Sequence, residues 1–186
     1  MRFAAGFFLS IVLISQSTTA LGADYVSPTS WFGYPGTMLN AEKTFTVWFP
    51  GKPAIKRGDE KIGAISVPKV WYYNLRFNSD PIAVFDVNDF DFSKLESGTP
   101  DEAYIAFLHA SGVKNFVDTP EPFGTAMGHR LTYGLADHPG NVIVRMVSNS
   151  GHLYTAGAVL PEGASQTVKD EADHFVNSLS LFDGQR

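Results

Sequence analysis

Apolar and polar residues alternate along several stretches of this chain, which is the period-two pattern of a β-strand with one buried face. In "TFTVWFPGKP" (44–53), Phe45, Val47 and Phe49 fall on one side of the predicted strand. Pro50 has no N–H to donate to a sheet, and Pro-Gly favours a turn, so we expect this strand to stop there. No side chain here is suited to catalysis, and we interpret the stretch as structural.

Five further alternating runs are separated by short turns, as is typical of an antiparallel meander. They cover residues 70–77, 82–87, 127–133, 141–149 and 152–159.

Two stretches have helical spacing instead. The first begins at Thr99, with Pro100 at the first helical position and Glu102 placed to complete a capping box, and it ends at Gly112. The second covers residues 165–179, where apolar residues recur at helical intervals. Strands, a helix, more strands and a last helix predict an α+β fold in which helices flank an antiparallel β-sheet.

The N-terminal segment has the layout of a secretory signal peptide. Arg2 precedes an apolar run from Phe3 to Ile14, and small residues follow, which places the predicted cleavage between Gly22 and Ala23. This run is shorter than the roughly 18 apolar residues that a membrane-spanning helix needs. We therefore expect a periplasmic or secreted protein with no membrane span after cleavage.

The sequence divides into three parts. We assign residues 1–22 to the signal peptide, residues 23–43 to an irregular lead-in rich in Gly and Pro, and residues 44–186 to a single α+β domain.

Composition narrows the choice of function. The chain has no Cys, so an exported domain must be stabilised by its hydrophobic core rather than by disulfides. The residues are 44% hydrophobic and 18% charged, which is enough apolar material for such a core. The net charge of −5, without runs of Lys or Arg, argues against nucleic acid as a partner.

The early strand and the end of the last helix together resemble a broad group of exported bacterial proteins. That group carries F-x-V-x-F-P-G-x-P early, here Phe45 to Pro53, and F-x-x-S followed by a hydrophobic residue late, here Phe175, Ser178 and Leu179. The group is similar to the PsbP-like fold, named after an extrinsic subunit of photosystem II. The resemblance spans about residues 44–182, and it implies an α/β/α sandwich with a non-catalytic accessory role. It implies no catalytic residues.

Metal and cofactor sites find no support in the residue spacing. The acidic run "DVNDFDF" (86–92) fails the EF-hand template in both registers, and we interpret its carboxylates as strand-end groups in a solvated turn. The five histidines lack the short spacings of zinc sites, and we expect His109 and His174 to be exposed on helices. We predict no metal and no cofactor.

Nucleophilic catalysis is equally unsupported, since the chain has no Cys and no G-x-S-x-G elbow. Ser150 lies two residues from His152, but a catalytic triad is assembled in space and this spacing alone does not make one. A non-catalytic role is therefore favoured, while an envelope hydrolase with a spatially assembled site stays an alternative.

A candidate binding patch rests on arginines that fall in the middle of predicted strands: Arg76, Arg130 and Arg145. A charge there must face solvent or be paired. If neighbouring strands bring them together, the patch would comprise Tyr72, Asn74, Arg76 and Arg130 and would bind an anion or a partner. The alternative is that each arginine pairs separately with an acidic residue.

The sequence thus predicts an exported, non-catalytic accessory or binding protein of the cell envelope, with an unknown envelope protein or small ligand as its partner. A carrier of a small apolar ligand is the remaining alternative.

Overall fold

The computed structural model describes residues 44–50, 53–76, 83–136 and 139–181. In chain order its elements are β1 (Phe45–Thr46), β2 (Ala54–Ile62), β3 (Ile65–Arg76), β4 (Ala83–Asp91), α2 (Pro100–Ala110), β5 (Lys114–Phe123), β6 (Ala126–Gly134), β7 (Gly140–Asn149), β8 (His152–Pro161), α3 (Gln166–Asn177) and β9 (Ser180–Leu181).

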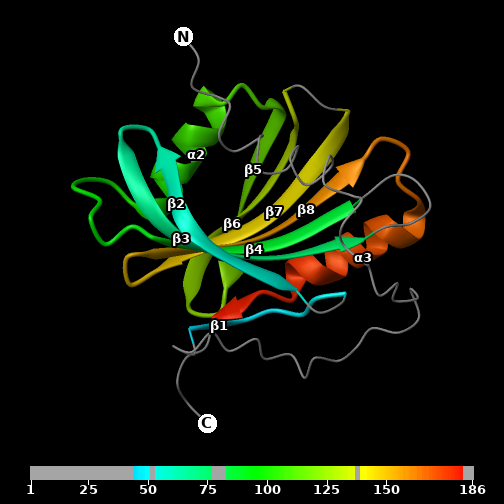
Figure 1. The fold of residues 1–186 in the computed structure, drawn as a ribbon, viewed down its shortest axis with the longest axis horizontal. Coiled ribbons are helices and arrows are strands. Elements are labelled where there is room, and N and C mark those ends of the chain that lie inside the picture. Colours follow the sequence, from blue (N-terminus) through cyan, green and yellow to red (C-terminus); the bar gives the residue numbers. More distant parts are fainter. Residues whose placement is uncertain (1–43, 51–52, 77–82, 137–138, 182–186) are drawn as a thin grey trace.

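Seven of these strands form one antiparallel sheet in the order β2-β3-β4-β8-β7-β6-β5 (Figure 1). The sheet consists of two meanders, β2–β4 and β5–β8, which are joined where β4 pairs with β8. The chain crosses from one meander to the other through α2. A separate pair, β1 with β9, brings the first and last described strands together.

The two helices lie on opposite faces of the sheet. Helix α2 contacts the edge strand β2 and also β8 and β7, so the sheet must curve around it (Figure 1). Helix α3 contacts the central strands β4, β8 and β7 from the other side. We call the α2 side the inner face and the α3 side the outer face.

Local chemistry explains where the helices begin. The Thr99 side chain accepts a hydrogen bond from the Glu102 N–H, and the Glu102 carboxylate accepts one from the Thr99 N–H, which is a complete capping box. Ser165 caps α3 in the simpler way, by accepting a hydrogen bond from the Val168 N–H. Both predicted helix starts are confirmed.

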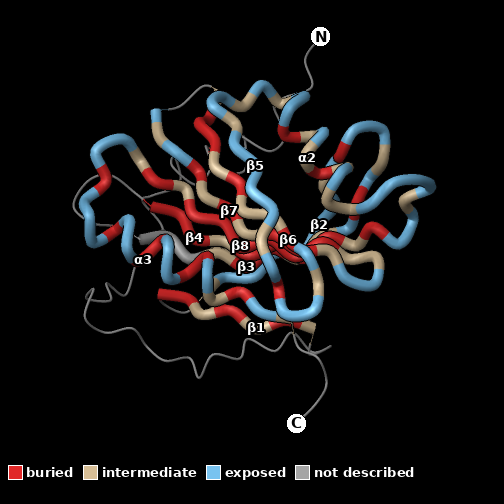
Figure 2. Tube along the Cα trace, turned by 180° about the vertical axis from the view of Figure 1, so that it is seen from behind, coloured by how far each residue is buried: buried red, intermediate tan, exposed pale blue. Residues whose placement is uncertain are grey.

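The expected α/β/α sandwich, in which helices form a layer on each face of the sheet, is wrong. The structure is mostly β, with 56% strand against 18% helix, and its two described helices have 11 and 12 residues against a sheet of seven strands. Two long strands, β2 and β5, were absent from the prediction. They are the two edges of the sheet and are exposed at most of their residues, so they show no alternation of apolar and polar residues (Figure 2).

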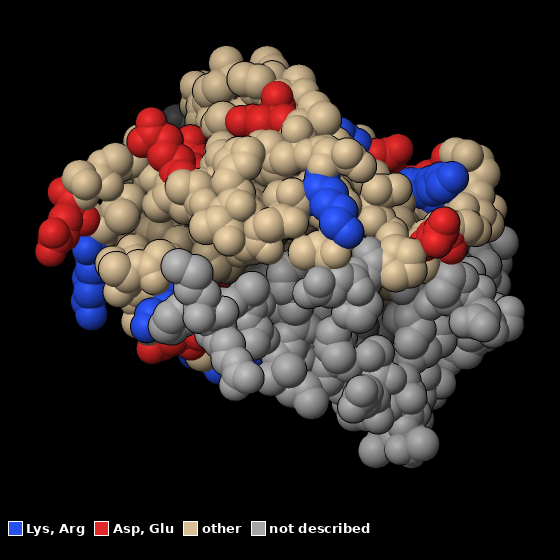
Figure 3. Space-filling model, turned by 90° about the horizontal axis from the view of Figure 1, so that it is seen from above, with Lys and Arg blue, Asp and Glu red and all other residues tan. Residues whose placement is uncertain are grey.

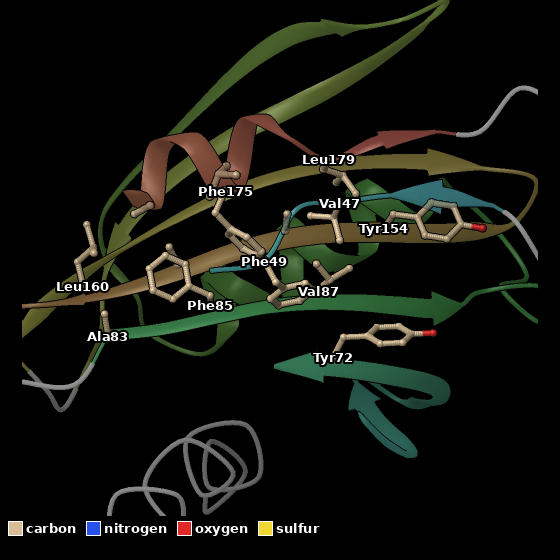
Figure 4. Close-up of a cluster of buried hydrophobic side chains, with 14 of the residues drawn as sticks. Val47, Phe49, Tyr72, Ala83, Phe85, Val87, Tyr154, Leu160, Phe175 and Leu179 are labelled. Carbon is tan, nitrogen blue, oxygen red and sulfur yellow. The ribbon is translucent and has the colours of Figure 1, made fainter. Parts of the chain in front are cut away.

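The outer core joins both ends of the domain. Phe45, Val47 and Phe49 are buried, as the alternation predicts, although only Phe45–Thr46 is a strand. In Figure 4, Phe49 lies between Phe175 of α3 and the side chains of β4, and its ring centroid is 4.9 Å from that of Phe175. The two motifs that carry the PsbP-like resemblance therefore contact each other.

A hydrogen bond fixes the same junction. The Trp48 N–H donates to Ser178 Oγ at 2.9 Å, and that hydroxyl donates in turn to the Phe175 carbonyl. The early motif thus packs on the helix end that the late motif forms, which gives both motifs a structural explanation.

The inner core packs under α2. Tyr104 and Leu108 are the buried residues of this helix, and they belong to one cluster with Phe90, Leu131 and Leu153 of the sheet.

The predicted signal peptide (1–22), its cleavage point between Gly22 and Ala23, and the lead-in (23–43) lie outside the described residues. Within the described ranges, neither helix has the length and apolar character required to cross a bilayer.

Candidate functional site

The residues of the predicted binding patch are separated in the structure. Tyr72 and Arg130 do lie in one row across the outer face, but Val87, Ala156 and Arg145 stand between them. Three intervening strands at roughly 4.8 Å spacing put them roughly 19 Å apart.

Tyr72 is also poorly placed to bind a partner, since it is 5% exposed and its ring packs edge-on against Phe45. Asn74 and Arg76 belong to the same strand, β3, but their side chains lie outside the described part of the structure. The described residues therefore do not form the patch as one surface.

Arg130 and Arg145 are direct neighbours on β6 and β7, and both are paired with carboxylates. Arg130 forms an ion pair with Asp173 of α3 and donates to Asn177 Oδ1 at 2.9 Å. Arg145 forms an ion pair with Glu121 of β5. For these two arginines the structure shows the ion-paired alternative.

Arg145 makes further contacts that a simple surface ion pair lacks. Its guanidinium donates to the carbonyls of Asn177 and Leu179, at 3.0 and 3.3 Å, and to the Pro122 carbonyl at 3.3 Å. It also lies 4.3 Å from the ring centre of Phe123. Because carbonyls at a helix C-terminus lack intrahelical donors, Arg145 satisfies the end of α3 and fixes it to the sheet.

The acidic run was misread from the sequence as a solvated turn. It lies in β4, between β3 and β8 in the middle of the sheet, so its side chains alternate between the two faces. Asp89 points to the outer face, where it contacts His152 Nδ1 at 2.8 Å. Asp86 and Asn88 point to the inner face, where they form part of a polar cluster.

This cluster is held by hydrogen bonds between three strands. Asp86 Oδ2 accepts from Trp71 Nε1 at 3.2 Å and from Asn88 Nδ2 at 2.9 Å. Asn88 Nδ2 also lies 3.2 Å from Thr155 Oγ1, to which it donates. Gly157, directly opposite Asp86, leaves room for the carboxyl, because a Cβ there would be 2.8 Å from Asp86 Oδ1.

The cluster forms the floor of a cavity between the sheet and α2. The cavity has a volume of about 20 Å³, which is space for a single water molecule or a group of that size. Its lining consists of Asp86, Asn88, Tyr104, Tyr133, Leu135, Val142, Val144, Thr155, Gly157 and Val159. The cavity is enclosed on most sides but is not sealed.

Burial dominates the electrostatics of this cavity. It raises the pKa of the Asp86 carboxyl, against the opposing effects of the Asn88 hydrogen bond, the Lys69 charge and the Trp71 hydrogen bond. Lys69 itself forms an ion pair with Glu60 at 2.8 Å. Burial also raises the pKa of Tyr104 and Tyr133, and the nearby Asp86 charge adds to both shifts.

Asp86→Asn is expected to raise the melting temperature at pH 7.5 and to change it little at pH 4. In the unfolded chain Asp86 loses its proton near 3.8, whereas its pKa in the folded protein is higher. At a pH between these two pKa values, unfolding therefore releases a proton from Asp86. The stability of the fold falls as the pH rises through this range, and it stays lower at higher pH. Asparagine has no proton to lose, and its oxygen can accept the bonds from Trp71 and Asn88.

Thermal unfolding followed by circular dichroism at both pH values tests this expectation. An Asn variant that melts earlier than the wild-type protein at pH 7.5 would show that the ionised carboxyl stabilises the fold.

The other Ser, His and Asp clusters are arranged unfavourably for a hydrolase. Ser148 Oγ donates to Asp101 Oδ1 at 3.0 Å, and Asp101 Oδ2 contacts His129 Nε2 at 3.3 Å, so the carboxylate stands between serine and histidine. In a catalytic triad the histidine must stand between them to take the serine proton. His129 Nδ1 contacts a second carboxylate, Asp118, at 2.9 Å.

The pair that the sequence singled out is not joined either. Ser150 Oγ donates to Asn149 Oδ1 at 3.2 Å, while His152 Nδ1 contacts Asp89. Within the described ranges, no group of three or more His, Cys, Asp or Glu side chains is arranged to hold a metal ion. His109 and His174 are exposed on their helices, which confirms their predicted placement.

Charged residues are dispersed on the surface seen in Figure 3. Acidic and basic side chains of the described residues are scattered there among uncharged ones, without forming a continuous area of one sign.

Comparison of the chain with protein families, curated proteins and solved structures finds no match. The PsbP-like resemblance stays a prediction from the two sequence motifs.

Proposed function

We propose that this chain is an exported, non-catalytic binding protein of the cell envelope, and that it holds a small ligand in the inner-face cavity. The observation that carries the proposal is the polar floor of that cavity. Asp86 is held there by Trp71 and Asn88 beneath walls that are otherwise aromatic and aliphatic. Small-molecule sites commonly combine a mainly apolar lining with a few fixed polar groups.

The size and lining of the cavity weigh against the two alternatives. A carrier for an apolar ligand needs a larger space without a carboxyl at its floor. A hydrolase needs a nucleophile beside a general base, and the Ser148–Asp101–His129 cluster has the carboxylate in the wrong position. The binding role is the reading that the side chains favour.

Native mass spectrometry of the protein purified from its own host tests the ligand. We expect the wild-type protein to carry a small bound mass that is absent from Val159→Phe, because the larger side chain fills the cavity. Val117→Phe is the matched control, since Val117 is 54% exposed on the edge strand β5 and away from the cavity. The same mass on all three proteins, or on none, would count against a ligand in this cavity.

The denatured mass of the same sample tests export. Because small residues precede Ala23 and the apolar run is short, we expect the mature chain to begin at or near Ala23. A product that retains Met1 would contradict export by signal-peptide cleavage.

A further inference from the structure

Three oxygen atoms around the cavity lack hydrogen-bond partners within the described part of the chain: Asp86 Oδ1, and the phenol oxygens of Tyr104 and Tyr133. The two tyrosines are 2% and 5% exposed. Buried phenol groups usually find a partner. An occupant of the cavity is the natural partner for all three.

The cavity lining has an acidic group but no basic one. Its lining contains one carboxyl and no Lys, Arg or His. The Lys69 ammonium, whose charge acts on Asp86, is engaged with Glu60 at 2.8 Å. An ionised Asp86 would therefore be best balanced by a cation that enters the cavity from outside.

We propose that the cavity binds the primary ammonium group of a small amine, which donates its three N–H groups to Asp86 Oδ1, Tyr104 and Tyr133. This inference rests on the proposed function. A primary ammonium has three donors and no acceptor, which matches three oxygens around one small space. The bond to Asp86 is charge-assisted.

Size limits the amine further. A cavity of about 20 Å³ accommodates an ammonium head, but not a quaternary ammonium with methyl groups on every side. Because this volume holds only a group of water size, the alkyl tail of a short amine must extend out through the open side of the cavity. The structure thus favours ammonium itself or a short alkylamine.

Because the pKa of Asp86 is raised, the affinity of the cavity for an amine should depend on pH. Burial favours the neutral carboxyl in the empty cavity, whereas a bound cation favours the carboxylate. Affinity for the amine is therefore expected to rise with pH through the titration of Asp86 and to level off above it.

Titration of the mature protein with methylammonium chloride, followed by NMR, is the test. We expect saturable shifts of the backbone amide signals of Asp86, Asn88 and Gly157, with no such shifts from tetramethylammonium chloride or from methanol. Asp86→Asn should weaken binding by about tenfold or more, and Tyr133→Phe by about threefold, since the first removes a charge-assisted bond and the second a neutral one. Asp91→Asn removes the same charge from the same strand outside the cavity lining and should bind as the wild-type protein does.

Each contrary outcome overturns the inference. Methanol that binds as well as methylammonium would show a site for neutral ligands, and tetramethylammonium that binds equally would show a wider or superficial site. No saturable shift with methylammonium would mean that ordered water alone occupies the cavity or that the ligand is no amine. In that case, a bound mass that is present on the wild-type protein and absent from Val159→Phe in native mass spectrometry would still support the proposed function. If the wild-type protein carried no such mass, both the amine inference and the proposed function would be wrong.

Discussion

Phe49→Ala is expected to lower the free energy of unfolding by about 3–5 kcal/mol, the range for truncating a fully buried phenylalanine. Phe49 is 2% exposed and sits between α3 and the sheet, with its ring 4.9 Å from that of Phe175 (Figure 4). Because Phe175 also packs edge-on against Phe85 of β4, a cavity at Phe49 loosens the attachment of α3 as well. Urea unfolding followed by tryptophan fluorescence measures the change.

Thr46→Ala is the matched control for Phe49→Ala. Thr46 lies in the same segment but is only half-buried, and the outer core does not include it. Its truncation should cost well under half as much. Equal losses at the two positions would show that the segment is covered on both sides.

Arg145→Ala is expected to lower the free energy of unfolding by about 2–4 kcal/mol, because it removes several charge-assisted hydrogen bonds at once. The variant leaves the carbonyls of Asn177 and Leu179 without their donor and Glu121 without its cation. The helix end and β9 both depend on that side chain. Hydrogen exchange should report the loss first in the amides of residues 175–181.

Arg130→Ala provides the comparison, since Arg130 is the direct neighbour of Arg145 across the two strands. Its partner Asp173 has a side chain that is 52% exposed, and an ion pair of that kind contributes about 0–1 kcal/mol. Arg145→Lys should behave like Arg145→Ala, because an ammonium cannot reach several acceptors as a planar guanidinium does. If Arg130→Ala lowers the free energy of unfolding as much as Arg145→Ala does, the exposure of an ion pair does not determine how much each arginine contributes to stability.

Local patterns identified much of this fold. Alternation located the central strands because one or both of their faces are buried. The first helix was recognisable from the capping box at Thr99, and the second from apolar residues at helical spacing in residues 165–179. The edge strands β2 and β5 have no such signal, since nothing packs on most of their residues. Their absence from the prediction also led to too large an expected share of helix.

The candidate site depended on strand order, which periodicity does not reveal. Tyr72 and Arg130 do share a face, but three strands lie between them. The cavity residues were missed because the carboxylates of the acidic run were interpreted as strand-end groups in a solvated turn. A carboxyl and an amide two residues apart in "AVFDVNDF", Asp86 and Asn88, instead fit one face of a buried strand. This two-residue spacing, with apolar residues before, between and after the two polar ones, was the sequence pattern that could have identified the cavity residues.

The pairing of β1 with β9 determines how the domain responds to tension. Phe45 lies opposite Leu181, and Thr46 opposite Ser180, so the outer ends of the two strands meet at the same point. A force that draws residues 45 and 181 apart therefore loads the hydrogen bonds of this pair one after another, as a zipper opens, rather than all together in shear. The next connections to be loaded are the Trp48–Ser178 hydrogen bond and the packing of Phe49 on Phe175. Under tension the β1–β9 pair would therefore separate first, and the seven-stranded sheet would be loaded last.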